Sequence, residues 1–309
     1  MVFAESAATP APTPAATPAA TRVGFIGVGK MGLPMIVHLH AAGFAVTAFD
    51  PLPDSRSQAM VAGCMVAPGI AACVAAADVV MSSLPNDAAL AAVAATIAEA
   101  ARPGLVFVDT STVSPGLSAE VAANLRAAGV RYVRATVSGN PVLARAAGLT
   151  VMASGPRDAY DFVKPLLDTF GKTHFYLGDG EQARVIKLVI NLMIAVSAGM
   201  MAEALALGEK GGLDWRQMLD IMGRSAAGSP MLNYKLPPLR ERDYASTFSG
   251  NQMIKDLDLI LGEAARTGVP VSLAAQMRQM YAAVAAQGDG DLDYIATVRL
   301  VERMAGIEV

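Results

Sequence analysis

Lys187 and Asn191 have the side chains in this sequence whose types and spacing best fit acid–base chemistry. They lie four residues apart in the stretch ARVIKLVINLMIAVSAGM, so on a helix they share one face. The neighbours of Lys187 are Val, Ile and Leu, and burial in such surroundings lowers the pKa of a lysine. A neutral amine can take a proton from a hydroxyl group and later return it, with Asn191 orienting the amine or a substrate. The alternative is a structural lysine that reaches solvent or pairs with an acid.

A second candidate site is the segment VGFIGVGKMGLPM, which begins at Val23. Its glycines form the pattern G-x-G-x-x-G between a predicted strand and a predicted helix, where bare backbone can approach a diphosphate at the helix N-terminus. The pattern therefore predicts a dinucleotide-binding loop. The residues expected to bind the cofactor there are Gly27, Val28, Gly29, Lys30, Met31 and Gly32.

Asp50 ends the second predicted strand, about 20 residues after the glycine pattern, where an acid can hold the ribose 2′-hydroxyl. Its carboxylate would repel a 2′-phosphate, and the next residues are Pro51, Leu52 and Pro53 rather than an arginine. NAD is therefore favoured over NADP, although Arg56 leaves room for NADP. The alternative reading of Asp50 is a turn residue before a proline.

Short Val-, Ile- and Phe-rich runs alternate with helical stretches from residue 22 to residue 180, which predicts an α/β domain with a parallel sheet. Residues 181–309 contain helical periods separated by Gly, Pro and Asp, so we expect an all-α domain. Residues 182–210 form one predicted helix of roughly 40 Å that joins the two. Three polar segments follow predicted strands, where the active-site loops of such sheets gather: SSLPN from Ser82, DTSTVSP from Asp109 and VSGN from Val137.

Composition limits the remaining possibilities. Lys and Arg number 24 against 27 Asp and Glu, mixed along the chain, which argues against a nucleic-acid partner. Residues 1–21 are rich in Ala, Pro and Thr and are expected to form a disordered tail without a signal peptide. The apolar run 188–202 is expected to be a helix buried in protein rather than a membrane span. Cys64 and Cys73 suit a reducing cytoplasm, and the His, Cys and acid spacing predicts no metal site.

The motifs together resemble those of the β-hydroxyacid dehydrogenases, which include 3-hydroxyisobutyrate dehydrogenase and 2-hydroxy-3-oxopropionate reductase. The matching segments are GFIGVGKMGLPM, DTSTVSP, TVSGN, KLVIN and MIKDLDL, in order, and the resemblance covers residues 22 to about 305. It implies a Rossmann-type N-terminal domain, a long interdomain helix, an all-α C-terminal domain and a homodimer or homotetramer.

The resemblance also implies roles for individual residues. Lys187 corresponds to the catalytic lysine and Asn191 to its partner on the helix. The loop that holds the substrate carboxylate corresponds to Ser138, Gly139 and Asn140. Further cofactor-binding positions correspond to Leu84, Pro85, Thr112 and Lys255, the last paired with Asp256. The family's loop commonly reads D-A-P-V-S-G-G, whereas this chain has Arg134 and Asn140 at the two ends, so its substrate is expected to differ.

These observations predict an NAD(P)-dependent oxidoreductase that transfers hydride reversibly between a small 3-hydroxy acid, such as 3-hydroxyisobutyrate, and the nicotinamide. One alternative is a 2-hydroxy-3-oxopropionate reductase or a 3-hydroxy amino acid dehydrogenase, in which Asn140 would bind an amine. A more distant alternative is a non-catalytic dinucleotide-binding module, because a fold alone does not fix function.

Overall fold

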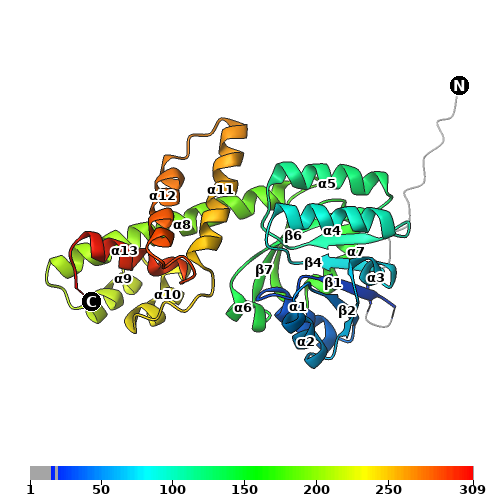
Figure 1. Ribbon diagram of the computed structural model, residues 1–309, viewed down its shortest axis with the longest axis horizontal. Coiled ribbons are helices and arrows are strands. Elements are labelled where there is room, and N and C mark those ends of the chain that lie inside the picture. The colour runs from blue at the N-terminus through cyan, green and yellow to red at the C-terminus, as the bar shows by residue number, and fades with distance from the viewer. Residues whose placement is uncertain (1–14, 18–19, 309) are drawn as a thin grey trace, which may run out of the picture. The chain divides into compact units, whose positions relative to one another are not determined.

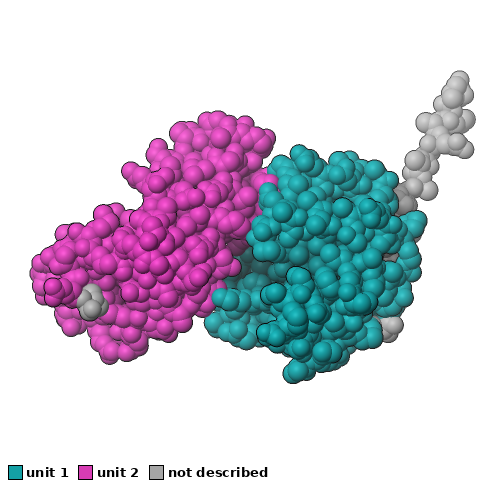
Figure 2. All heavy atoms as spheres, in the orientation of Figure 1, with its two compact units in different colours: residues 1–111, 116–183 teal, residues 112–115, 184–309 magenta. Residues whose placement is uncertain are grey.

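The chain divides into two compact units in the computed structural model, which describes residues 15–17 and 20–308. The first unit holds the described residues up to Ser111 together with Gly116–Ala183. The second holds Thr112–Pro115 and the described residues from Arg184 onward (Figure 2). The short segment Thr112–Pro115 therefore belongs with the C-terminal helices, although the sequence places it within the α/β half.

The first unit is built on one eight-stranded sheet of order β3-β2-β1-β4-β5-β6-β7-β8. The strands are β1 Arg22–Ile26, β2 Ala45–Phe49, β3 Met65–Val66, β4 Val79–Ser82, β5 Val106–Asp109, β6 Arg131–Ser138, β7 Leu149–Ser154 and β8 Gly171–Tyr176. All neighbouring pairs are parallel except β6 and β7. The prediction of an α/β domain with a parallel sheet is thus confirmed, with β7 as the one antiparallel neighbour among the described strands. The connection from Ser138 to Leu149 contains only the five-residue helix α6, and parallel neighbours need a longer crossover.

Helices cover both faces of this sheet, as a mostly parallel sheet requires. They are α1 Gly32–Ala41, α2 Pro53–Val61, α3 Ile70–Ala75, α4 Asp87–Ala100, α5 Pro115–Ala127, α6 Pro141–Arg145 and α7 Arg157–Leu167. In Figure 1, α4 and α5 run side by side over one face, and α1 and α2 lie on the other. Buried side chains such as Phe25, Met81 and Val108 fill the space between sheet and helices.

The expected tail, residues 1–21, lies largely outside the described residues, which include only residues 15–17, 20 and 21 of it. Ala16 is buried in the core, and its N–H donates to Phe162 O on α7 at 2.9 Å. Thr21 is buried as well, and its N–H donates to Thr17 O at 3.0 Å. Ala16 and Thr21 therefore pack within the first unit, whereas the disorder expected for residues 1–21 as a whole stays a prediction.

The second unit is helical throughout its described residues, apart from an isolated bridge between Ser249 and Asp293. Its elements are α8 Gln182–Lys210, α9 Trp215–Arg224, α10 Pro230–Arg240, α11 Gly250–Thr267, α12 Ser272–Ala286, the 3₁₀ turn η1 Tyr294–Ala296 and α13 Thr297–Met304. The bounds of α8, whose first two residues belong to the first unit, match the predicted helix. Helix α10 was not predicted, since Pro237 and Pro238 argue against a helix interior.

Helix α8 is only partly buried. Its inward residues, among them Ala195, Ala198 and Leu205, join the core of the second unit. Within the described residues, α8 alone is long and apolar enough to span a membrane, and 39% of its most apolar window is buried. The prediction of a helix buried in protein is therefore wrong for one of its faces. That face carries Val185, Val189, Met193, Met200 and Leu207, all exposed.

Candidate active site

The glycine loop is held open by hydrogen bonds between neighbouring strand ends. Gly27 follows β1 with φ of 92°, and its N–H donates to Phe49 O at 2.9 Å. The N–H of Val28 donates to Oδ2 of Asp50 at 2.7 Å. Helix α1 then begins with Leu33 N–H donating to Gly29 O at 3.0 Å. The loop thus joins a strand to a helix N-terminus in the arrangement that binds a diphosphate.

The three glycines of the pattern are required for different reasons. A Cβ on Gly27 would lie 2.3 Å from Ser83 O, and one on Gly32 would lie 2.0 Å from Gly27 O, so the fold excludes both. A Cβ on Gly29 would meet nothing within 4 Å. The protein therefore leaves an open space beside Gly29, which we call the cradle and which a side chain at this position would fill. Such a space allows a diphosphate to approach the bare backbone.

Asp50 is buried at the end of β2, and both of its carboxylate oxygens accept backbone hydrogen bonds. Oδ2 receives the Val28 N–H, and Oδ1 receives the Leu52 N–H at 2.9 Å. Arg56 lies at the same strand end, where its guanidinium donates to Asp50 O at 2.8 Å and to Pro51 O at 2.9 Å. Asp50, which is predicted to bind the ribose, thus also holds the turn after β2, and the Arg56 guanidinium lies next to this turn.

Leu84 and Pro85 follow β4 in a loop anchored by the buried carboxylate of Asp109, the first residue of the predicted DTSTVSP segment. The hydroxyls of Ser82 and Ser111 both donate to Asp109 Oδ1, at 2.5 and 2.6 Å. Ser111 Oγ in turn accepts the Leu84 N–H at 2.7 Å. Asp109 is fully buried at the end of β5, so it fixes the predicted cofactor-lining loop against the next strand.

The predicted carboxylate loop, Ser138, Gly139 and Asn140, ends β6 and leads into α6. Gly139 has a φ of 140°, where a side chain would be strained. Asn140 is the N-cap of α6, and its Oδ1 accepts the Leu143 N–H at 3.0 Å. Asn140 therefore has a structural role. Arg134 lies four positions before Ser138, buried within β6 and paired with Glu181.

In the second unit, α8 and α11 bring together side chains that lie far apart in the sequence. The amide of Asn191 donates to Oδ2 of Asp256, which is buried. Lys255 pairs with Asp256 Oδ1 at 2.8 Å and donates to Thr112 O at 2.7 Å. Lys187, Asn191, Thr112, Lys255 and Asp256 thus form one cluster, which we call the lysine cluster.

Lys187 is half-buried in this cluster. Burial lowers its pKa, the Asp256 carboxylate raises it in part, and the Lys255 ammonium lowers it further. A lysine in this environment exchanges a proton more readily near neutral pH than one in water. The sequence indicates Asp256 only as the neighbour of Lys255, because the charge pattern of α11 does not show that its carboxylate accepts a hydrogen bond from Asn191.

Helix α11 positions the acid–amine pair through a defined start. Ser249 Oγ accepts the Gln252 N–H at 3.2 Å, and Gln252 Oε1 accepts the Ser249 N–H at 2.9 Å, which forms a capping box.

Within the described part of the chain, no group of three or more His, Cys, Asp or Glu side chains could hold a metal ion.

The fold, the glycine loop and the cradle at Gly29 define a dinucleotide-binding protein with an appended helical unit. Two family models match the chain. The NAD-binding domain of 6-phosphogluconate dehydrogenase matches residues 22–178, and the NAD-binding domain of NADP-dependent 3-hydroxyisobutyrate dehydrogenase matches residues 181–301.

Similar proteins agree with this assignment. The 2-(hydroxymethyl)glutarate dehydrogenase of Eubacterium barkeri is 32% identical, with 93% of this chain and 97% of that protein covered. The NAD-dependent L-serine dehydrogenase of Pseudomonas aeruginosa is 29% identical, with 92% and 99% covered. The solved Mycobacterium tuberculosis 3-hydroxyisobutyrate dehydrogenase with L-serine has a TM-score of 0.84 and 31% identity, with 91% and 99% covered. The chain belongs to the β-hydroxyacid dehydrogenase family and is an NAD(P)-dependent 3-hydroxyacid dehydrogenase.

Proposed function

We propose that Lys187 is the general acid and base of this dehydrogenase. The observation that carries the proposal is the lysine cluster, in which burial lowers the pKa of an amine held beside Asn191 and Asp256. When the hydroxy acid is oxidised, the neutral Lys187 amine takes the hydroxyl proton, and in the reverse direction the ammonium returns it. NAD(P), when bound, would supply the nicotinamide that exchanges the hydride with the substrate carbon.

The other residues of the site bind and orient. Ser138 and Gly139 hold the substrate carboxylate, which restricts the orientation of the substrate and so contributes to the rate. Lys255, through its hydrogen bond to Thr112 O, holds the segment after β5 that is proposed to line the nicotinamide. The loop from Gly27 to Gly32 holds the diphosphate, and Leu84 and Pro85 line the cofactor.

The proposed substrate is a small 3-hydroxy acid of the 3-hydroxyisobutyrate type. The named relatives act on hydroxymethylglutarate and L-serine, so a 3-hydroxy amino acid is a second candidate. Asn140, the residue that would bind the amine of such a substrate, already caps α6 through its side-chain oxygen. Initial rates with 3-hydroxyisobutyrate, glycerate, serine and threonine, each with NAD and NADP, separate the candidates. The highest kcat/KM on an amino acid would contradict the hydroxy-acid proposal.

The role of Lys187 is tested by two substitutions. Lys187→Ala removes the amine, and Lys187→Arg keeps a positive charge that does not dissociate. Both are expected to lower kcat by roughly 10²- to 10⁴-fold while cofactor affinity stays near that of the wild type. Lys172→Ala, an exposed lysine on β8, is the matched control and should keep full turnover. Unchanged kcat in either Lys187 variant would reject the assignment.

Three finer expectations complete the proposal. NAD is the preferred cofactor, supported by the buried Asp50 carboxylate at the end of β2. The chain forms a homodimer through the exposed apolar face of α8. In a symmetric dimer the same face of both subunits meets, so each apolar face would be buried against the other. The enzyme works in the cytoplasm, which suits its two free, buried cysteines, Cys64 and Cys73.

A further inference from the structure

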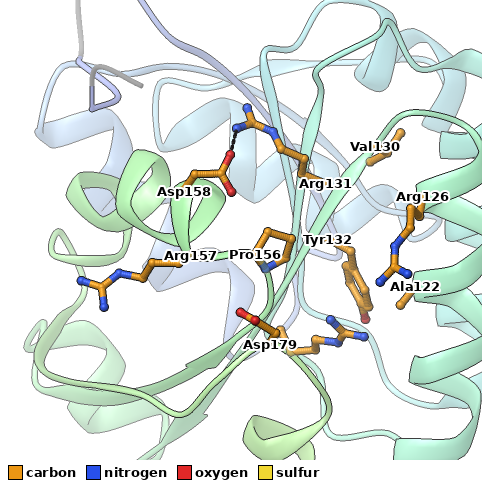
Figure 3. A pocket seen from close by; sticks show the side chains of 10 residues that line it. Ala122, Arg126, Val130, Arg131, Tyr132, Pro156, Arg157, Asp158 and Asp179 are labelled. Carbon is orange, nitrogen blue, oxygen red and sulfur yellow. Dashed lines mark hydrogen bonds and ion pairs between the residues drawn. The ribbon is translucent and has the colours of Figure 1, made fainter. Parts of the chain in front are cut away.

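The first unit has a cavity of about 410 Å³ that takes no part in the proposed reaction. It is lined by the start of β6, the end of α5, the first turn of α7 and the loop after β8 (Figure 3). The glycine loop and Ser138 lie at the carboxyl ends of the parallel strands, whereas Arg131 and Tyr132 begin β6. The cavity therefore opens at the opposite edge of the sheet.

Cations outnumber acids in its lining. Arg126, Arg131, Arg134 and Arg157 face two carboxylates, Asp158 and Asp179. Two of the arginines are already neutralised, because Arg131 pairs with Asp158 at 2.9 Å and Arg157 pairs with Asp161 at 2.9 Å. In Figure 3 the guanidinium of Arg157 also points away from the cavity.

Arg134 is a buried guanidinium with unused hydrogen-bonding capacity. It is 4% exposed, it lies over the ring of Tyr132 with 4.6 Å to the centroid, and it pairs with Glu181 through one terminal nitrogen. Its Nε has no hydrogen-bond partner among the described residues. A buried charged group normally uses all its donors, so the Nε–H of Arg134 is available to a further acceptor.

Arg126 supplies a second guanidinium across the same aromatic ring. It is exposed in the last turn of α5 and has no ion pair within the described part of the chain. Figure 3 shows its guanidinium directed toward Tyr132. Ala122, Val130 and Pro156 add an apolar wall. Guanidinium groups bind carboxylate and phosphate oxygens in pairs, and the cavity has the volume of a small-ligand site.

We propose that this cavity is a second ligand site, which binds a small organic oxyanion, a carboxylate or a phosphate ester, between Arg126 and Arg134. The oxyanion accepts hydrogen bonds from the two guanidiniums, and its carbon skeleton packs against Ala122, Val130 and Pro156. The site is separate from the loop that binds the diphosphate and from the loop proposed to bind the substrate carboxylate.

Calorimetric titration of the whole protein with citrate and with inorganic phosphate tests this site. Saturating NADH is present throughout, so that the diphosphate loop is filled and does not contribute. Binding is expected at millimolar or lower concentration, and about tenfold weaker in Arg126→Ala, equivalent to ~1.4 kcal/mol. Arg134→Lys keeps the charge but loses the planar fork and should weaken binding as well.

Lys172→Ala is the matched control, because it removes one exposed cation of the same unit that does not line the cavity. Binding of citrate alone identifies a carboxylate with a carbon skeleton, and binding of phosphate alone identifies a phosphate group. The proposal is overturned if neither anion binds at on the order of 10 mM. It is equally overturned if Arg126→Ala binds as the wild type does, or if Lys172→Ala loses as much affinity.

Discussion

The side-chain amide of Asn191 on α8 donates a hydrogen bond to the buried carboxylate of Asp256 on α11. The two residues are 65 positions apart, and Lys187 lies one helical turn before Asn191. This contact places a negative charge near the amine proposed to carry the proton. It explains why burial and Asp256 act on the pKa of Lys187 in opposite directions.

The pH dependence of the reaction should follow the pKa of Lys187. Oxidation needs the neutral amine, so kcat/KM for the hydroxy acid should rise with pH through a pKa below the usual lysine value. Reduction needs the ammonium and should decline through the same range. Because the Asp256 carboxylate raises this pKa, Asp256→Asn should move both limbs to lower pH. Asp258→Asn, two residues on and paired with Arg278, is the control. An unchanged pH profile in Asp256→Asn would contradict the effect of the Asp256 carboxylate on the pKa of Lys187.

Gly29 and Gly32 should respond differently to the same substitution. Gly29→Ala meets open space in the protein, so its thermal midpoint should match the wild type, whereas its NADH affinity should fall about tenfold or more, ~1.4 kcal/mol. Gly32→Ala would bring a Cβ within 2.0 Å of Gly27 O and should destabilise the fold by about 1–3 kcal/mol. Calorimetry and fluorescence titration measure the two effects. Normal cofactor affinity in Gly29→Ala would exclude a diphosphate at this cradle.

Cofactor preference should depend on Asp50 and Arg56 in opposite ways. Asp50→Asn removes a charge that repels a 2′-phosphate, so the ratio of kcat/KM for NAD to that for NADP should fall about tenfold. Arg56 lies at the same strand end through its bonds to Asp50 O and Pro51 O. Arg56→Ala should reduce the kcat/KM for NADP and spare that for NAD. Equal NAD-to-NADP ratios of kcat/KM in the wild type and both variants would show that neither side chain distinguishes the ribose 2′-hydroxyl from a 2′-phosphate.

The exposed face of α8 should determine the oligomeric state. Met193 and Met200 are 63% and 60% exposed and lie seven residues apart, on one side of the helix. Met193→Glu combined with Met200→Glu should convert a dimer into a monomer in size-exclusion chromatography with light scattering. Met304→Glu, at 75% exposure on α13, is the matched control and should stay dimeric. A wild-type monomer at micromolar concentration would refute the dimer, and a tetramer that survives the double substitution would move the interface elsewhere.

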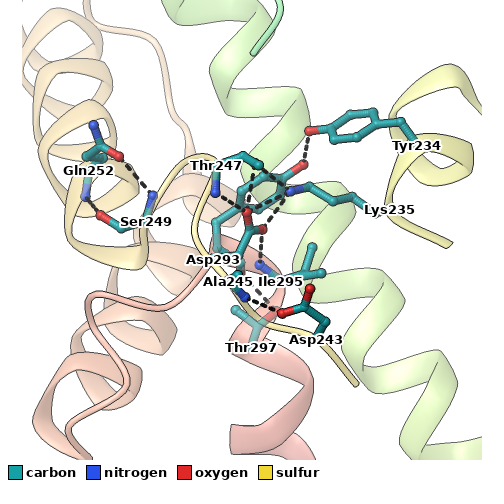
Figure 4. A network of polar contacts seen from close by, with 11 residues as sticks. Tyr234, Lys235, Asp243, Ala245, Thr247, Ser249, Gln252, Asp293, Ile295 and Thr297 are labelled. Atoms are coloured by element: carbon teal, nitrogen blue, oxygen red, sulfur yellow. Dashed lines mark hydrogen bonds and ion pairs between the residues drawn. The ribbon is translucent and has the colours of Figure 1, made fainter. Parts of the chain in front are cut away.

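The buried ion pair of Lys235 and Asp293 should be important for stability (Figure 4). Both side chains are almost fully buried, 2.7 Å apart, and Asp293 also accepts hydrogen bonds from the N–H and hydroxyl of Thr247. Asp293→Ala leaves a buried, uncompensated ammonium and should lower the free energy of unfolding by about 3–5 kcal/mol in urea titrations. Glu241→Ala breaks the exposed pair with Arg216 and should cost less than about 1 kcal/mol. Similar losses in both variants would be inconsistent with this difference in burial.

The sequence by itself determined the features that depend on local spacing. The G-x-G-x-x-G pattern, the alternation of apolar strands with helices and the bounds of α8 each follow from the chemistry of neighbouring residues, so reading along the chain was sufficient. Lys187 and Asn191 were recognised in the same way, because one helical turn places them on one face.

Tertiary structure alone decided the features that join distant segments. The pairing of β7 with β6 is visible only in the folded sheet, although the short connection and the sequence Asn140-Pro141 already favour an antiparallel neighbour and an N-cap. The contact of Asp256 with Asn191 and that of Lys255 with Thr112 O connect residues 65 and 143 positions apart. Charge and hydrogen bonding act through space, so the environment that shifts the pKa of Lys187 exists only after the helices have packed.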